Sequence, residues 1–102
     1  MSVQSVHIVA EVTVKDDNAD EMWNRVSRLV KPSRSENGNI SYHALRDVDN
    51  PAHFIFVEAW ECAADFDAHL NAAHVVAHNE ATRDLLEVPV RITICESAPE
   101  SN

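Results

Sequence analysis

The sequence predicts an α+β fold in which an antiparallel sheet carries helices on one face, the ferredoxin-like split βαβ arrangement. Two observations predict it. Several short segments alternate apolar and more polar residues with a period of two, which is typical of strands. Helical segments fall after the first of these strands and before the last, so the predicted order is β-α-β-β-α-β.

The first strand is predicted over residues 6–14, and the first helix from about residue 16 to Pro32. In the strand every second residue is apolar: Val6, Ile8, Ala10, Val12 and Val14. Asp16-Asp17-Asn18 then provides an N-cap side chain and negative charge at the end of the helix where the dipole favours it. The helix has one apolar stripe, formed by Ala19, Met22, Trp23, Val26, Leu29 and Val30.

The middle of the chain is predicted to form a β-hairpin. A polar turn contains Gly38, the only glycine, which favours a backbone conformation that other residues resist. Residues 40–46 and 53–60 both alternate, and the turn-forming segment Asp47-Val-Asp-Asn-Pro51-Ala lies between them. The two segments are therefore close enough to pair.

The rest of the chain supplies the second helical region and the last strand. We expect a helix over residues 62–70, one or two more short helical pieces over about residues 72–86, and a strand over residues 88–95. The whole chain, residues 1–102, is expected to be one domain, with its core at about residues 6–96 and a loose tail at 97–102.

The predicted sheet has apolar residues on both faces, but the helices cover only one. A second copy of the same sheet could bury this second face without any other protein. We therefore predict a homodimer that packs sheet to sheet.

Charge, cysteine content and the absence of long apolar runs limit the expected partners and location of the protein. The formal net charge is −9, from 17 acidic and 8 basic residues, so we expect neither nucleic acid nor membrane as a partner. Cys62 and Cys95 form no close-spaced metal or redox motif and are expected to be reduced thiols. The chain starts without a basic and apolar leader and has no apolar run near the ~18 residues of a membrane span, so a cytoplasmic location is predicted.

Three histidines lie close together in the segment EAWECAADFDAHLNAAHVVAH. On one straight helix His69 and His74 would lie about 140° apart, and His69 and His78 about 180° apart, so the three could not bind one ion. His74 and His78 share a face, but no carboxylate stands at clear ligand spacing, so no metal site is predicted and His78 is expected to be exposed. His69 lies at the edge of an apolar stripe. It is either a core-edge residue bonded to the backbone or a pocket residue suited to proton transfer.

The side chains of the strand predicted over residues 53–60 also belong either to the core or to a pocket. Phe54, Phe56, Glu58 and Trp60 share one face. A buried Glu58 must be paired, hydrated or protonated, so it either forms an ion pair with Arg46 or Arg83, or lines a pocket with a raised pKa. The aromatic residues are either core or pocket walls.

Other side chains complete the candidate set. The hydroxyl of Tyr42, on the neighbouring strand, could bind a substrate oxygen. His7, His43 and His53 are expected on the opposite face or in loops, and no role is assigned to them.

A set of these residues resembles a known domain: Tyr42, Asp47-Val-Asp-Asn-Pro51, Phe54, Glu58-Ala-Trp60-Glu61, Asp67-Ala-His69-Leu70 and His74. It is similar to the antibiotic biosynthesis monooxygenase domain of the dimeric α+β barrels, over about residues 6–96. The resemblance implies a dimeric α+β barrel with a pocket between sheet and helices in each subunit. Relatives of this kind oxidise quinols, anthrones and similar phenols with dioxygen, using neither flavin nor metal.

Other members of the superfamily degrade haem or isomerise a phosphorylated sugar derivative. Where haem-degrading relatives have asparagine, tryptophan and histidine, this sequence has Val9, His69 and Asn79, so haem degradation is not expected.

The sequence therefore favours a cofactor-independent monooxygenase acting on a small aromatic substrate and dioxygen. His69 or Glu58 is the expected proton acceptor. Tyr42 and His74 are expected to orient the substrate, and the aromatic contacts are expected from Trp60, Phe66, Phe54 and Phe56. No GxGxxG fingerprint or P-loop is present, so no cofactor is predicted. A non-oxidative isomerase and a non-catalytic small-molecule-binding dimer remain as alternatives for the same pocket.

Overall fold

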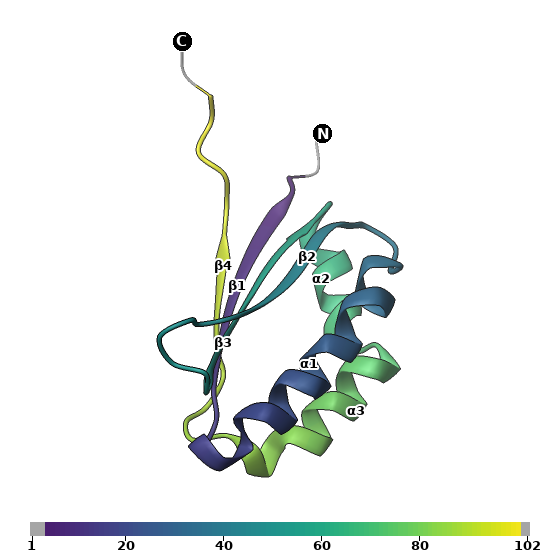
Figure 1. Ribbon diagram of the computed structural model, residues 1–102. Helices are drawn as coiled ribbons and strands as arrows, with labels where there is room; N and C mark the ends of the chain where they lie inside the picture. Colours follow the sequence, from purple (N-terminus) through teal and green to yellow (C-terminus); the bar gives the residue numbers. More distant parts are fainter. Residues whose placement is uncertain (1–3, 101–102) are drawn as a thin grey trace.

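The computed structural model describes residues 4–100 and confirms the predicted ferredoxin-like α+β fold. One four-stranded antiparallel sheet has the strand order β2-β3-β1-β4, and the helices lie on one of its faces (Figure 1). The elements are β1 (Val6–Thr13), η1 (Asp16–Asn18), α1 (Ala19–Arg34), β2 (Asn39–Arg46), β3 (His53–Trp60), α2 (Ala63–Leu70), α3 (Ala73–Thr82), η2 (Arg83–Leu85) and β4 (Arg91–Cys95). Within residues 4–100, no helix is both long enough and apolar enough to cross a membrane.

The starts of α1 and β4 differ from the prediction. The expected side-chain N-cap of α1 is wrong, since Asn18 makes no capping hydrogen bond and the 3₁₀ turn η1 leads into the helix instead. Strand β4 begins at Arg91 rather than at residue 88. Pro89 lies between and has no N–H to donate to a neighbouring strand, which explains the late start. Of the predicted tail, residues 97–100 have no helix or strand, and residues 101–102 lie outside the described part.

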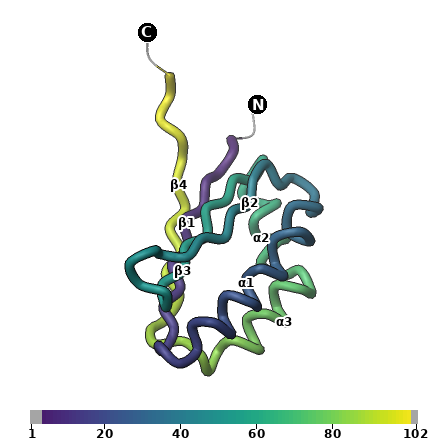
Figure 2. The backbone as a smooth tube through the Cα atoms, viewed as in Figure 1, coloured from purple at the N-terminus to yellow at the C-terminus, as the bar shows by residue number. Residues whose placement is uncertain are grey.

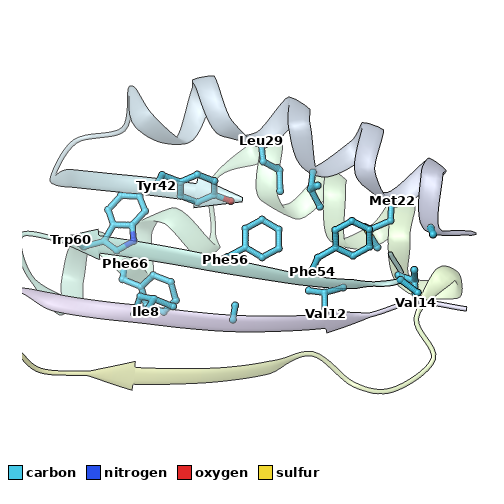
Figure 3. Close-up of a cluster of buried hydrophobic side chains, with 14 residues drawn as sticks. Ile8, Val12, Val14, Met22, Leu29, Tyr42, Phe54, Phe56, Trp60 and Phe66 are labelled. Atoms are coloured by element: carbon cyan, nitrogen blue, oxygen red, sulfur yellow. The ribbon is translucent and has the colours of Figure 1, made fainter. Parts of the chain in front are cut away.

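The core lies between the sheet and α1. Every second side chain of β1 and β3 points toward the helices, where α1 and α3 run side by side (Figure 2). Figure 3 shows Tyr42, Trp60 and Phe66 gathered at one end of this layer, and Met22 and Val14 at the other. The strand register places Glu58 directly opposite Ile8 on one side and Tyr42 on the other. Glu58 is therefore a polar residue within an otherwise apolar face.

Apolar residues remain uncovered on both sides of the sheet. On the face away from the helices, Leu45 and Val57 are 47% and 40% exposed. Strand β4 lies at the sheet edge away from the helices (Figures 1 and 2), so Ile92 and Ile94 are 46% and 61% exposed although they point to the helix-bearing side. As predicted, His7, His43 and His53 point to the face opposite the helices.

Gly38 is required by the turn between α1 and β2. Its φ is +82°, and a Cβ at this position would overlap the side chain of Asp65. Gly38→Ala is therefore expected to lower the free energy of unfolding by about 1–3 kcal/mol, measured by urea denaturation. Asn37→Ala is the matched control, because Asn37 is exposed in the same turn and its φ is not positive. Equal stability of the two variants would contradict the prediction.

Candidate functional site

A cavity of about 330 Å³ lies between the sheet and the helices. Its walls are mostly apolar and include Ile8, Leu29, Phe56, Phe66 and Val75. Tyr42, Glu58 and His69 contribute polar groups to the lining. An apolar cavity of this size with a few polar groups is typical of a site for a small molecule.

Glu58 is buried, with 5% of its surface exposed. Its Oε1 accepts a hydrogen bond from Nε1 of Trp60 at 3.0 Å and lies 3.7 Å from Nε2 of His69. The predicted ion-pair alternatives are wrong: Arg46 instead binds Asp20, and within residues 4–100 the only ion-pair partner of Glu58 is His69. Burial raises the pKa of Glu58, and the bond from Trp60 and the nearby His69 offset this only in part.

The raised pKa of Glu58 makes folding stability depend on pH. An unfolded chain gives up this proton near pH ~4.3, whereas the folded protein keeps it to higher pH. The contribution of Glu58 to stability therefore falls as pH rises from about 4.3 through the raised value, because the folded state binds more protons there.

Glu58→Gln removes this titration and keeps an oxygen for Trp60. We expect the difference in unfolding free energy between this variant and the unchanged protein to shift in favour of the variant from pH 4 to pH 7. Urea unfolding at both pH values measures it. Glu61→Gln, an exposed neighbour, is the control and should show no such gain. A parallel pH dependence for Glu58→Gln and the unchanged protein would contradict the assignment.

His69 lies in the last turn of α2 and is 4% exposed. Its Nδ1 is 2.6 Å from Oε2 of Glu36, while Nε2 is directed toward Glu58. The ring centroid is 4.7 Å from that of Trp60 and 5.6 Å from that of Tyr42. His69 therefore lines the cavity between two carboxylates and is not a core-edge residue bonded to backbone.

His74 lies beside His69 because the helix breaks between them. Helix α2 ends at Leu70 and α3 begins at Ala73, so the angle expected for one straight helix is wrong for this pair. The two imidazole centroids are 6.1 Å apart. Nε2 of His74 lies 3.3 Å from Glu36 and 3.1 Å from the hydroxyl of Ser33.

His78 is separate from this group. It is half-buried and lines the cavity from α3, so the expectation of an exposed residue is wrong. Burial, with a smaller contribution from the charge of Arg25, lowers the pKa of His78 to about 4. His78 is therefore neutral at pH 7 and can exchange hydrogen bonds with a ligand without adding charge.

Tyr42 is 2% exposed. Burial, followed by the negative charge of Glu58, raises its pKa above the ordinary value, and a hydrogen bond with Ser33 offsets this only in part. Its hydroxyl therefore keeps its proton at neutral pH and acts as a hydrogen-bonding group rather than as a base.

The structure divides the predicted site residues into two groups. Lining the cavity are Tyr42, Phe56, Glu58, Phe66 and His69. Outside the lining are Phe54, Trp60 and His74. Phe54 stacks on Trp23 at 5.9 Å between centroids, and Trp60 is fully buried behind the cavity, where it holds Glu58.

Sequence reasoning missed Glu36 and Ser33. Glu36 lies in the turn after α1, and no periodic pattern links it to a histidine 33 residues further along the chain. Glu36, His69 and His74 each offer an atom within 4.8 Å of the others, so these three could hold a metal ion. Glu36, which is distant in the sequence, therefore provides the carboxylate that is missing at ligand spacing near the histidines.

Comparisons with known proteins agree with this architecture. The family model described as "Antibiotic biosynthesis monooxygenase" matches residues 5–81. A Synechocystis protein, "Uncharacterized protein sll1783", is 32% identical over 91 residues, covering 89% of this chain and 62% of its own length, so the chain spans less than two thirds of that relative.

Two further proteins are similar over nearly their whole length. The Bacillus subtilis protein named "Putative monooxygenase YcnE" is 28% identical over 87 residues, covering 85% of this chain and 92% of its own. The crystal structure of PA3566 from Pseudomonas aeruginosa superposes with a TM-score of 0.89 at 23% identity, covering 97% of this chain and 99% of the other. Since the family model covers well over half of the 102 residues, the chain belongs to the antibiotic biosynthesis monooxygenase family.

Proposed function

We propose that the protein is a cofactor-independent monooxygenase that oxidises a small phenolic, quinol or anthrone-type substrate with dioxygen. The observation that carries this proposal is the buried pair of His69 and Glu58, 3.7 Å apart, at the edge of a mostly apolar cavity. A proton acceptor in a site shielded from water is the main requirement of this chemistry.

The substrate itself supplies the electrons. Once its hydroxyl or acidic C–H is deprotonated, the aromatic ring is electron-rich enough to reduce dioxygen directly. For an anthrone, the ring methylene becomes a carbonyl with one oxygen atom, and the other oxygen atom leaves as water with the two methylene hydrogens. The protein therefore needs to bind, deprotonate and shield the substrate.

The site residues divide these tasks. The pair of His69 and Glu58 accepts the substrate proton, and Tyr42 donates a hydrogen bond to a substrate oxygen. Phe56 and Phe66 contact the aromatic ring, since they form apolar walls of the same cavity.

A homodimer completes the proposed architecture. The exposed apolar side chains Leu45 and Val57 lie on the sheet face that no helix of residues 4–100 covers, and a second sheet would bury them. Size-exclusion chromatography with light scattering at micromolar concentration is expected to give twice the monomer mass of 11.4 kDa. A stable monomer at that concentration would contradict the proposal.

The function is tested by oxygen uptake. The purified protein is mixed with a panel of reduced naphthoquinols and anthrones in the presence of a chelator, and the uncatalysed rate is subtracted. Protein-dependent uptake with an oxygenated product is expected. Product formation without oxygen uptake would identify an isomerase, and saturable ligand binding without any product would identify a binding protein.

A further inference from the structure

Glu36 contacts two histidines at one end of the cavity. Its Oε2 lies 2.6 Å from Nδ1 of His69 and 3.3 Å from Nε2 of His74. The three side chains come from the turn after α1, from α2 and from α3. Glu36 is 18% exposed and His69 only 4%, so the shorter contact is largely shielded from water.

The short contact determines which nitrogen of His69 carries the proton. A carboxylate only accepts hydrogen bonds, so Nδ1 of His69 must donate to Glu36. In neutral imidazole the other nitrogen is then unprotonated, so the lone pair of Nε2 is directed toward Glu58 and the cavity. Without Glu36, Nε2–H would be favoured because it could donate to Glu58 in the same way.

Glu36 is itself held in place. Nε2 of His74 lies within reach of both Glu36 and Ser33, and Ser33 is fully buried. The same carboxylate oxygen is therefore held by a second imidazole, which limits its freedom to turn away. Such fixed partners are what set the tautomer and the orientation of a functional imidazole.

From this geometry we infer that Glu36 is the positioning residue that keeps His69 in the Nδ1–H tautomer, with Nε2 free to take a proton from a molecule in the cavity. The use of Nε2 as proton acceptor rests on the proposed function, whereas the tautomer itself does not. Glu36 is not among the residues that line the cavity, and it acts there through its contact with His69.

The tautomer can be measured directly in the full chain without any substrate. Long-range proton–nitrogen correlation spectra of the ¹⁵N-labelled protein, at about pH 8.5, distinguish the two neutral forms of His69. The unchanged protein is expected to show Nδ1–H. Glu36→Ala is expected to move the proton to Nε2, whereas Glu36→Gln, which keeps a carbonyl oxygen, should retain Nδ1–H.

Glu80→Ala is the matched control, because Glu80 is an exposed glutamate on α3, away from this group. Backbone amide spectra verify that each variant is folded. Nε2–H in the unchanged protein, or Nδ1–H retained in folded Glu36→Ala, would overturn the inference while leaving the oxygen-uptake test untouched. Micromolar binding of Zn²⁺ to the chelator-treated protein, with loss of the His69 Nδ1–H signal, would also overturn it, since these atoms would then serve a metal.

Discussion

His69→Ala is expected to lower the turnover of a phenolic substrate by about a hundredfold or more, because positioned proton transfer contributes ~10²–10⁴-fold in rate. The imidazole is the cavity group that lies between Glu36 and Glu58, and its removal leaves Glu58 without its only ion-pair partner within residues 4–100. The measurement is the steady-state rate of oxygen uptake with a substrate identified from the quinol and anthrone panel.

Glu80→Ala is the control for this prediction, since Glu80 is exposed on α3 and is not among the residues that line the cavity. Its rate should equal that of the unchanged protein. A rate loss in kcat with little change in KM is expected for His69→Ala, because the lost interaction acts in the transition state. Unchanged turnover in folded His69→Ala would remove this residue from the proposed mechanism.

Phe54→Ala is expected to cost about 3–5 kcal/mol of unfolding free energy, the range for truncating a buried phenylalanine. The side chain is 1% exposed and lies between Trp23 and the rest of the core, with the Arg46 guanidinium 5.7 Å from its ring centroid. Because small domains have only about 5–15 kcal/mol in total, much of the stability would be lost. Urea denaturation followed by tryptophan fluorescence measures the change.

The milder variant Phe54→Leu distinguishes a core role from a ligand contact. It keeps most of the volume, so it is expected to fold and to cost less than ~1.5 kcal/mol. Since Phe54 does not line the cavity, Phe54→Leu should leave KM for the substrate unchanged. A raised KM in this folded variant would mean that Phe54 contacts the ligand after all.

The strands were predictable because their signal is local. A period of two in β1 and β3 identifies the buried face directly, and it places Glu58 among apolar neighbours. Because a buried, isolated carboxylate is costly, the side chain of Glu58 had to be paired, hydrated or protonated. The partner turned out to be His69, on an element whose position the strand pattern does not encode.

Residues brought together by the packing of separate elements were not predictable in the same way. Glu36 belongs to an irregular turn, so no periodicity assigns it a face, and only the packing of α1 beside α3, together with the position of α2, brings it to the histidines. The separation of α2 from α3 is itself predictable, since the sequence divides residues 62–70 from the helical pieces after residue 72. The angle between His69 and His74 is not, because the 100° rule holds only for one straight helix and gives no direction across the break at Asn71 and Ala72.

The break between α2 and α3 also makes the site depend on the length of the connection at Asn71 and Ala72. Asn71 is exposed and donates its side-chain amide to the backbone of Asp67, so by position alone it resembles a site where residues can be added or lost. Asn71 and Ala72 are the whole connection between α2 and α3, so removal of Asn71 would leave one residue to join the two helices. The end of α2 or the start of α3 would then have to move, and the His74 imidazole would lose its place beside Glu36. This short surface turn therefore tolerates changes of residue type far better than changes of length.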